Sequence, residues 1–442
     1  MTATEQPTAV PRWAGLLYAE GAFGFNVLHQ MQTLWLVYFY APPTESGRTA
    51  LAPIALLTVL FALGRLVEAF DDLAIGYWSD VTRSRWGRRL PFIVAGAPFV
   101  GILFVLLWLP PPLEPVGVAF YVFLVLQGFY FAATVVQQPY EAVLAEMSRD
   151  SATRVRVSTW KVAFGVVGAA VGLIGSGVLI ERIGFAATGA VFAVLGVGSV
   201  VLTVAGIRRL PRAPAPNQPI TLPRALLLTT TNRQFLVFVT SSVLFFLGLN
   251  LLTLLLPYFA TVILRQSEGL VSMLTAAFTA VAFLSLPLVG RLAAWRSKAF
   301  AFKAAMGALG LLLPGLFFVG LLPGIDPVTQ GFVYVAVLGV PMAALFVLPS
   351  PLIADIIDDD ARRTGMRREG IYYAADVTVR KLGFALSTAI FGAVLAAFGY
   401  SAEQPLGVRL VGPIAGFGVL LGLLLFSVGY RLPDRIDPDP SK

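Results

Sequence analysis

The sequence has no cysteine and only one histidine, His29, in 442 residues. A disulfide framework and a thiolate metal site are therefore excluded, and one histidine cannot build a multi-histidine zinc site. Charge is scarce as well. Asp, Glu, Lys and Arg make up 13% of the chain, about half of the roughly 25% typical of soluble domains. This composition argues against a soluble fold.

Motifs that carry enzymatic chemistry are also missing. The phosphate-cradling G-x-x-x-x-G-K-[ST] loop is absent, and the dipeptide Gly-Lys occurs nowhere in the chain. Neither a G-x-S-x-G elbow nor an H-E-x-x-H pair is present. We therefore expect neither an ATP-driven pump nor an enzyme, and we expect no cofactor.

Apolar residues dominate the chain: hydrophobic types make up 57% of it, and the mean hydropathy is +0.80. Runs such as Val116–Val136 are almost entirely apolar, whereas the strands of a transmembrane barrel alternate polar and apolar residues. The pattern predicts an all-α, multi-pass integral membrane protein. Twelve transmembrane helices are expected, over residues 13–41, 50–79, 89–110, 117–146, 154–180, 184–207, 229–263, 269–293, 299–321, 329–357, 370–399 and 405–430.

A proline-rich segment divides these spans six and six. Residues Arg208–Arg224 hold five prolines and four arginines, a composition that cannot span a membrane and is typical of an extended linker. We expect an N-terminal six-helix bundle over residues 1–207 and a cytoplasmic linker over 208–228. A C-terminal six-helix bundle with a short cytoplasmic tail is expected over 229–442.

The basic residues predict the orientation, because cytoplasmic loops carry an excess of Lys and Arg. With a cytoplasmic N-terminus, only four of the 32 fall in the opposite loops: Arg48, Arg182, Arg265 and Arg409. Both termini are therefore expected in the cytoplasm, and the membrane is expected to be the plasma (inner) membrane. This placement also explains a pI near 9.8 without a nucleic-acid partner.

Four charged residues lie inside the second span. Arg65, Glu68 and Asp72 are spaced i, i+3 and i+7 and share one helix face, with Asp71 beside it. If the span ends near Asp80, Glu68 lies about 18 Å and Asp72 about 12 Å from that end. Four ionised residues at this depth would cost on the order of 10 kcal/mol unless they were partnered or hydrated. Such a cost indicates that these residues form a functional site.

Other spans also carry polar residues at helical spacing. They are Asn26 and Gln30 in span one, Thr134, Gln137, Gln138 and Glu141 in span four, Trp160 and Lys161 in span five, and Tyr373, Asp376, Arg380 and Lys381 in span eleven. Intramembrane acids outnumber intramembrane bases. A bound Na⁺ or H⁺ would offset part of the deficit, and hydroxyl, amide and carboxylate oxygens are the ligands that a hard cation prefers.

Structural interpretations of these residues remain open. Asp376 and Arg380 are four residues apart, which also fits an internal salt bridge. Arg65 could simply neutralise the charge of Glu68. The carboxylates of span two could form a structural contact between helices instead of a binding site. Trp160 and the tyrosines also fit packing or an interfacial belt.

Three blocks carry a resemblance to a known family. They read RLVEAFDDLAIGYWSDVTRSRWGRRLPFI from Arg65, QPYEAVLAEMSRD from Gln138 followed by STWK, and LPSPLIADIIDDDARRTGMRREGIYYAADVTVRKLG from Leu348. With the twelve-span layout, they resemble the glycoside–pentoside–hexuronide cation symporters, the melibiose permease group of the major facilitator superfamily. The resemblance implies the major facilitator fold and transport by alternating access between two six-helix bundles.

The resemblance also implies roles for individual residues. Glu68 and Asp72 fall at the family's cation-binding carboxylates, with Asp71 and Thr134 as further ligands. Lys381 falls at a span-eleven lysine that communicates with this site, and Arg65 is assigned to coupling with it. The chain departs from the family at Asp71 and Glu68, and the added charge and longer side chain would favour H⁺ over Na⁺ if a carboxylate is kept neutral.

The solute is expected to be a small molecule, with a sugar or glycoside favoured because the polar groups suit a polyol. The candidate solute-binding residues are Asn26, Gln30, Gln137, Gln138, Glu141, Trp160, Lys161, Tyr373, Asp376 and Arg380. Asn26 and Gln137 replace the galactosyl-binding aspartates of melibiose permease, which argues against galactoside specificity. Lysolipid symporters share the acid pair and the lysine, so a lysolipid or other amphiphile is an alternative. A non-transporting membrane solute sensor is another.

Charged residues of the cytoplasmic loops are candidates for ion pairs that close an inner gate. They are Asp80, Arg83, Arg88, Arg89, Glu146, Asp355, Asp358, Arg362 and Arg363. The alternative is that these residues only set the membrane topology. Beyond the solute, the coupling ion and the lipid bilayer we expect no partner, and we expect a monomer.

Overall fold

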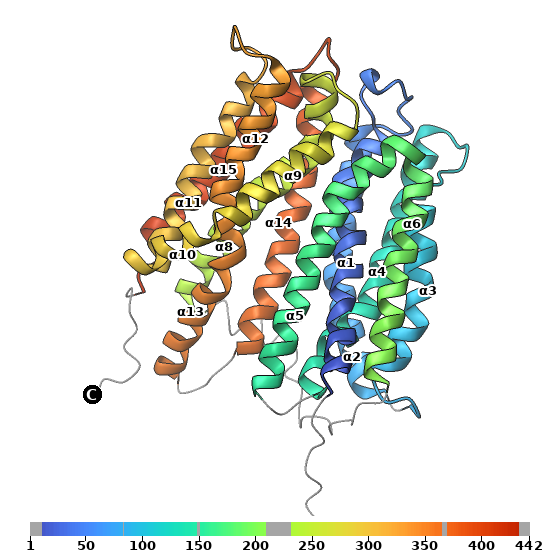
Figure 1. The fold of residues 1–442 in the computed structure, drawn as a ribbon, viewed down its shortest axis with the longest axis vertical. Coiled ribbons are helices and arrows are strands. Elements are labelled where there is room, and N and C mark those ends of the chain that lie inside the picture. The colour runs from blue at the N-terminus through green and yellow to red at the C-terminus, as the bar shows by residue number, and fades with distance from the viewer. Residues whose placement is uncertain (1–10, 83, 148–150, 209–230, 365–368, 433–442) are drawn as a thin grey trace, which may run out of the picture. The chain divides into compact units, whose positions relative to one another are not determined.

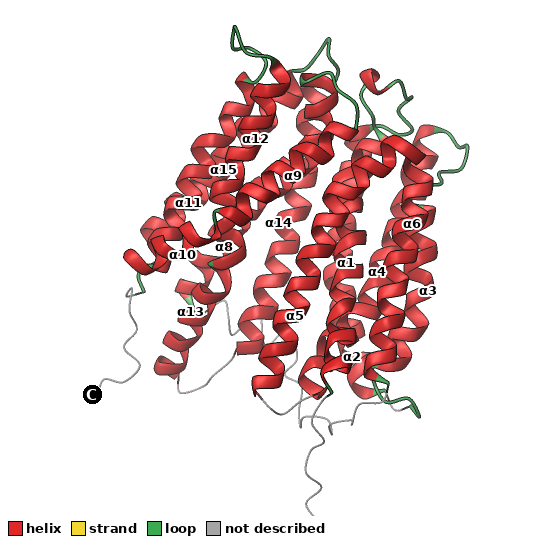
Figure 2. Cartoon of the chain, viewed as in Figure 1, coloured by secondary structure: helices red, strands yellow, loops and turns green. Residues whose placement is uncertain are grey.

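The computed structural model describes residues 11–82, 84–147, 151–208, 231–364 and 369–432. Within these residues every regular element is a helix and no strand is present (Figure 2). A helix satisfies all its backbone hydrogen bonds internally, as a lipid-spanning segment requires. The expected all-α fold class is confirmed.

The first half of the chain forms long helices joined by short loops (Figure 1). Its elements are α1 (Arg12–Tyr40), the short 3₁₀-helix η1 (Thr44–Ser46), α2 (Ile54–Val81), α3 (Leu90–Leu106), α4 (Pro115–Met147), α5 (Ser151–Ala170), the π-helical turn η2 (Val171–Gly175) and α6 (Ser176–Ile207). Gly184 interrupts α6 with a φ of 79°, a conformation that glycine adopts without a Cβ clash.

The second half repeats this pattern with more interrupted helices. Its elements are α8 (Arg233–Tyr258), the π-helical turn η3 (Phe259–Ile263), α9 (Gly269–Leu284), α10 (Leu286–Trp295), α11 (Lys298–Leu312), the 3₁₀-helix η4 (Leu313–Phe318), α12 (Pro327–Val347), α13 (Pro349–Thr364), α14 (Glu369–Phe398) and α15 (Leu406–Gly429). Polar caps begin three of them. In each case the side chain of the capping residue accepts a hydrogen bond from the backbone N–H three residues further on. The capping residues are Asn232 for α8, Ser297 for α11 and Asp326 for α12.

Eight helical stretches of the described residues are long and apolar enough to cross a membrane. One of them, Val155–Ile207, runs for 53 residues and holds two crossing segments that separate at Gly184. The stretches do not include α1 and α2, which carry the polar residues of the expected site, or α3, which has 17 residues. Together these segments fit the twelve predicted spans.

The helices group into two compact units. One comprises residues 1–36 and 67–219, and the other comprises residues 37–66 and 220–442. In the first unit, α3 packs against α4 and α6. In the second, α8 packs against α14 and α15, and α9 packs against α12. The division at residues 207 and 229 stays a prediction, and in this structure residues 37–66 pack with the second half.

Close helix packing in the second unit depends on Gly339 of α12. A Cβ added there would lie 2.4 Å from the carbonyl oxygen of Phe278 in α9. We expect Gly339→Ala to lower the free energy of unfolding by about 1–3 kcal/mol, because the two helices must move apart. Thermal unfolding of the purified protein in detergent measures the change.

Gly290 in α10 is the matched control, because a Cβ added there meets nothing within 4 Å. Gly290→Ala should be neutral or stabilise by up to about 1 kcal/mol, since alanine has the higher helix propensity. Equal melting temperatures for the two variants would contradict this account of the packing.

Candidate functional site

The acidic face of α2 meets a hydroxyl group from α4. Glu68, Asp71 and Asp72 are half-buried, and Thr134 is 5% exposed. The Thr134 hydroxyl donates a hydrogen bond to Oδ1 of Asp72 at 3.1 Å. Two of the four residues expected to hold a cation are thus in direct contact, although they lie 62 residues apart in the chain.

Carboxylate and hydroxyl oxygens are suitable ligands for Na⁺, and a carboxylate alone suffices for H⁺. Among the described residues, no group of three or more His, Cys, Asp and Glu side chains has the geometry of a metal site. Glu68, Asp71 and Asp72 therefore do not converge as three carboxylate ligands. A sodium ion here would take part of its coordination from Thr134, from backbone carbonyls or from water.

A second charged cluster joins α4 to α5. Lys161 pairs with Glu141, and its Nζ lies 5.1 Å from the centroid of the Tyr140 ring. The Tyr140 ring stacks on Tyr18 of α1 with 4.7 Å between centroids, and the Tyr18 hydroxyl donates to the Tyr140 carbonyl at 3.0 Å. The ammonium group of Lys161 is therefore held between a carboxylate and an aromatic face.

The polar residues of α1 face glycines of the neighbouring helical stretch. The Asn26 amide donates to the carbonyl of Ala22 in its own helix at 2.8 Å, and it lies beside Gly165 of α5. Gln30 lies beside Gly172 of η2 in the same way. The glycines allow α1 to approach closely, so Asn26 and Gln30 both lie along this helix contact.

The aromatic residue Trp160 packs against Gly15 of α1, with the Arg156 guanidinium 5.7 Å from its ring centroid. This placement matches the packing interpretation of the sequence. Gln137 of α4 is exposed, and Gln138 beside it is half-buried.

In α14, Asp376 and Arg380 form an ion pair, as the salt-bridge interpretation of their spacing proposed. The Asp376 side chain is 1% exposed, so its carboxylate is not open to a solute in this structure. The Arg380 guanidinium lies 4.8 Å from the ring centroid of Phe246 in α8. Tyr373 is exposed, and its hydroxyl donates to the Ser350 carbonyl at 3.4 Å.

Coupling between Lys381 and the α2 carboxylates stays a prediction, because these residues belong to different compact units. Lys381 and Arg65 are both half-buried. Glu20 of α1 accepts a hydrogen bond from the Ser199 hydroxyl of α6 at 2.8 Å.

Three of the gate candidates have partners that the sequence did not predict. Arg89 donates to the hydroxyl of Ser79, Asp355 pairs with Lys298 of α11 at 2.6 Å, and Arg363 pairs with Asp359 at 3.0 Å. Each of these contacts is local to one unit. Arg88 and Asp358 are half-buried and Arg362 is exposed. Arg83 and the side chains of Asp80 and Glu146 lie outside the described residues.

Comparison with known proteins gives consistent results. Residues 17–432 match the family model described as MFS/sugar transport protein. The isoprimeverose transporter of Lactiplantibacillus pentosus is 23% identical, over 95% of this chain and 88% of the relative. The sodium-dependent lysophosphatidylcholine symporter 1 of Xenopus tropicalis is 23% identical, over 83% of this chain and 78% of the relative. Among solved structures, nucleoside transporter NupG superposes with a TM-score of 0.65 at 14% identity, covering 94% of this chain and all of the other, and this likeness shows the fold.

The buried pair in α14 gives a stability prediction. Arg380→Met should lower the free energy of unfolding by about 3–5 kcal/mol, because it leaves the Asp376 carboxylate buried without its partner. The double variant Asp376→Asn/Arg380→Met should recover much of this loss. Thermal unfolding in detergent measures both variants, and a double variant no more stable than Arg380→Met would show that the pair is not the cause.

Proposed function

Because the chain belongs to the MFS/sugar transport protein family, we propose that it is a cation-coupled symporter that carries a sugar or glycoside by alternating access. The family match confirms the resemblance to the glycoside–pentoside–hexuronide cation symporters, and the likeness to solved transporters confirms the expected major facilitator fold. Transport without enzymatic chemistry also agrees with the absence of catalytic motifs from the sequence.

The hydrogen bond from Thr134 to Asp72 is the observation that carries the proposed cation site. An ionised carboxylate inside a membrane-spanning helix is costly, and a bound Na⁺ or H⁺ removes much of that cost. Glu68, four residues before Asp72 in α2, lies on the same helix face and adds a second carboxylate. The site is therefore more stable with a cation bound, which couples cation occupancy to the state of α2.

The polar residues of α1, α4 and α5 support a sugar as the solute. Asn26, Gln30, Gln137 and Gln138 offer amide donors and acceptors, and Lys161 offers a charged donor, which together suit the hydroxyl groups of a polyol. The similarity to the isoprimeverose transporter points to the same class of solute. If the cation and the sugar both stabilise one conformation, each raises the affinity for the other.

A lysolipid or other amphiphile is the second candidate solute. The similarity to a lysophosphatidylcholine symporter favours it, since that relative matches 83% of this chain. The proposed cation site on α2 and α4 would serve either solute, because its carboxylate and hydroxyl ligands bind the cation and not the solute.

Ligand-induced stabilisation of the purified protein tests the proposal. A panel of sugars and lysolipids is added with and without Na⁺ at two pH values, and the melting temperature is recorded. We expect a sugar to stabilise by about 2.7 kcal/mol at 100 times its dissociation constant. The shift should grow with Na⁺ or at the lower pH, and this cation dependence should vanish in Asp72→Asn.

Glu403→Gln, which removes an exposed acid from the loop after α14, should keep the cation dependence. An Asp72→Asn variant with undiminished cation dependence would contradict the site assignment. An increase in melting temperature with lysolipids alone would indicate that the protein transports amphiphiles and not sugars.

Removal of the Thr134 hydroxyl tests the second proposed ligand. Thr134→Val should weaken the apparent affinity for the coupling cation about fivefold, since a hydrogen bond or ligand oxygen of this kind contributes ~1 kcal/mol. Thr134→Ser should retain the affinity. The measurement is the cation concentration that gives half of the maximal thermal shift.

Thr253→Val is the matched control, because within the described residues the Thr253 hydroxyl bonds to the Leu249 carbonyl of its own helix alone, at 3.0 Å. If Thr134→Val and Thr253→Val titrate alike, Thr134 is not a ligand.

A further inference from the structure

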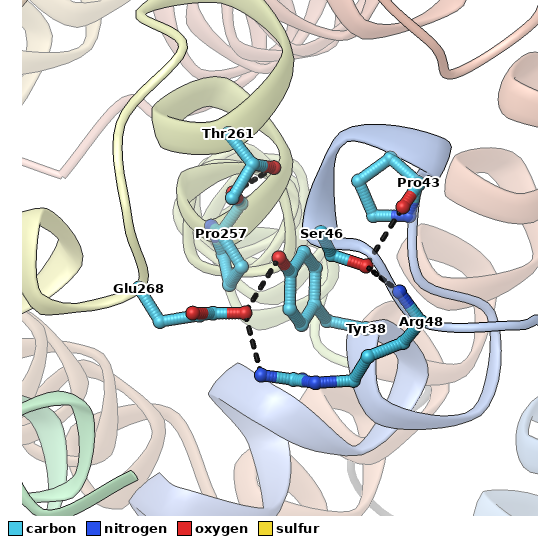
Figure 3. A network of polar contacts seen from close by, with 7 residues as sticks. All are labelled: Tyr38, Pro43, Ser46, Arg48, Pro257, Thr261 and Glu268. Atoms are coloured by element: carbon cyan, nitrogen blue, oxygen red, sulfur yellow. Dashed lines mark hydrogen bonds and ion pairs between the residues drawn. The ribbon is translucent and has the colours of Figure 1, made fainter. Parts of the chain in front are cut away.

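A polar network joins the end of α1 to the chain that follows η3 (Figure 3). Oε1 of Glu268 accepts a hydrogen bond from the Tyr38 hydroxyl at 3.2 Å and from Nη2 of Arg48 at 2.7 Å. The Glu268 side chain is 14% exposed and the Arg48 side chain is 36% exposed, so the pair is partly shielded from solvent. The partners lie 230 and 220 residues apart in the sequence but in the same compact unit.

The turn that carries Arg48 is held in shape by its own hydrogen bonds. The Ser46 hydroxyl donates to the Pro43 carbonyl at 2.8 Å and accepts from the Arg48 N–H at 3.3 Å (Figure 3). Gly47 has a φ of 68°, the left-handed conformation in which glycine avoids a Cβ clash. The backbone therefore presents Arg48 to Glu268 without a long flexible loop.

The turn that carries Glu268 is also built locally. Pro257 lies inside the helix, and the Thr261 hydroxyl donates to its carbonyl at 2.9 Å. The helix then widens into the π-turn η3, a feature frequent at functional sites. Arg265 has a φ of 54°, and the N–H of Gln266 returns to the Ala260 carbonyl at 3.0 Å. The helical stretch ends at Ile263, five residues before Glu268.

Aromatic packing lies next to the ion pair. The buried hydroxyl of Tyr258 donates to the carbonyl of Ala41 at 2.8 Å. The Tyr258 ring meets the rings of Tyr38 and Phe391 with centroids 5.2 and 5.5 Å apart. Ala41 itself is 0% exposed. The contact between the end of α1 and α8 therefore combines an ion pair with buried aromatic packing.

The position of Arg48 calls for an explanation beyond membrane topology. It is one of four basic residues on the side where the positive-inside rule disfavours Lys and Arg. Another of the four, Arg409, donates to the carbonyls of Phe317 and Val319 and so caps the end of η4. Arg48 instead holds an acid from a distant part of the chain.

We propose that Tyr38, Arg48 and Glu268 form a latch that keeps this end of α1 on α8 and η3, and that the latch opens and closes during transport. The proposal rests on the proposed alternating-access function, because a transporter must seal and then open this face. An ion pair with partial solvent access suits this task, since water can replace its hydrogen bonds when the elements separate.

The absence of cysteine from the chain provides a direct test. Ala41→Cys places a single thiol in the buried contact, where a soluble maleimide reaches it only after the latch opens. The alkylation rate of the purified protein in detergent then reports the open fraction. Adding Glu268→Gln should raise this rate about tenfold, which corresponds to ~1.4 kcal/mol of lost latch stability.

Two variants control the measurement. Glu403→Gln removes an exposed acid from the loop between α14 and α15 and should leave the rate unchanged. The charge exchange Arg48→Glu/Glu268→Arg should return the rate toward that of the parent. If Glu268→Gln fails to fold, Tyr38→Phe removes one hydrogen bond, keeps the ion pair, and should raise the rate about threefold.

The latch is wrong if Glu268→Gln, or Tyr38→Phe in its place, labels no faster than the parent, or if Glu403→Gln accelerates labelling equally. This assay needs neither solute nor flux. If the cation site is wrong, Asp72→Asn will keep the cation dependence of the melting-temperature shift. The labelling assay measures the latch independently of that result.

Discussion

Charge inside hydrocarbon is the constraint on which this structure depends, because each intramembrane carboxylate has to be partnered, hydrated or protonated. Asp72 accepts a hydrogen bond from the Thr134 hydroxyl. The other two carboxylates form ion pairs, Glu141 with Lys161 and Asp376 with Arg380. Each partner comes from the same helix or from another helix of the same unit, so these contacts depend on close helix packing. Close approach at glycines such as Gly165 makes such packing available.

The three carboxylates differ in what could replace their partners. Asp376 is buried and paired with Arg380 of its own helix, so this pair suits a structural or positioning role. Glu141 is more exposed than Lys161, and the pair lies against the Tyr140 ring, where a polar solute could compete for it. Asp72 has a neutral hydrogen-bond donor in Thr134, and under the proposed function a coupling cation would bind beside these two side chains.

Much of the fold could be predicted from the sequence, because long apolar runs identify spans and prolines with arginines identify linkers. Boundaries shifted by a few residues: the span expected at 50–79 is α2 from Ile54 to Val81, and the break expected before 184 is the positive φ of Gly184. Hydropathy reports how each residue is buried but not which residue it meets. The contacts of Asp355 with Lys298 and of Arg48 with Glu268 were therefore missed, whereas the contact of Asp72 with Thr134 was anticipated through the family resemblance.

Current measurements on a solid-supported membrane test the central claim most directly, because cation-coupled symport of an uncharged sugar must move charge. Proteoliposomes containing the protein are exposed to rapid sugar jumps from a panel, in the presence of Na⁺ at fixed pH or across a pH range without Na⁺. The account predicts a transient current for at least one sugar that requires one of the two cations. Sugar uptake into the same liposomes without current under either cation would contradict coupled transport.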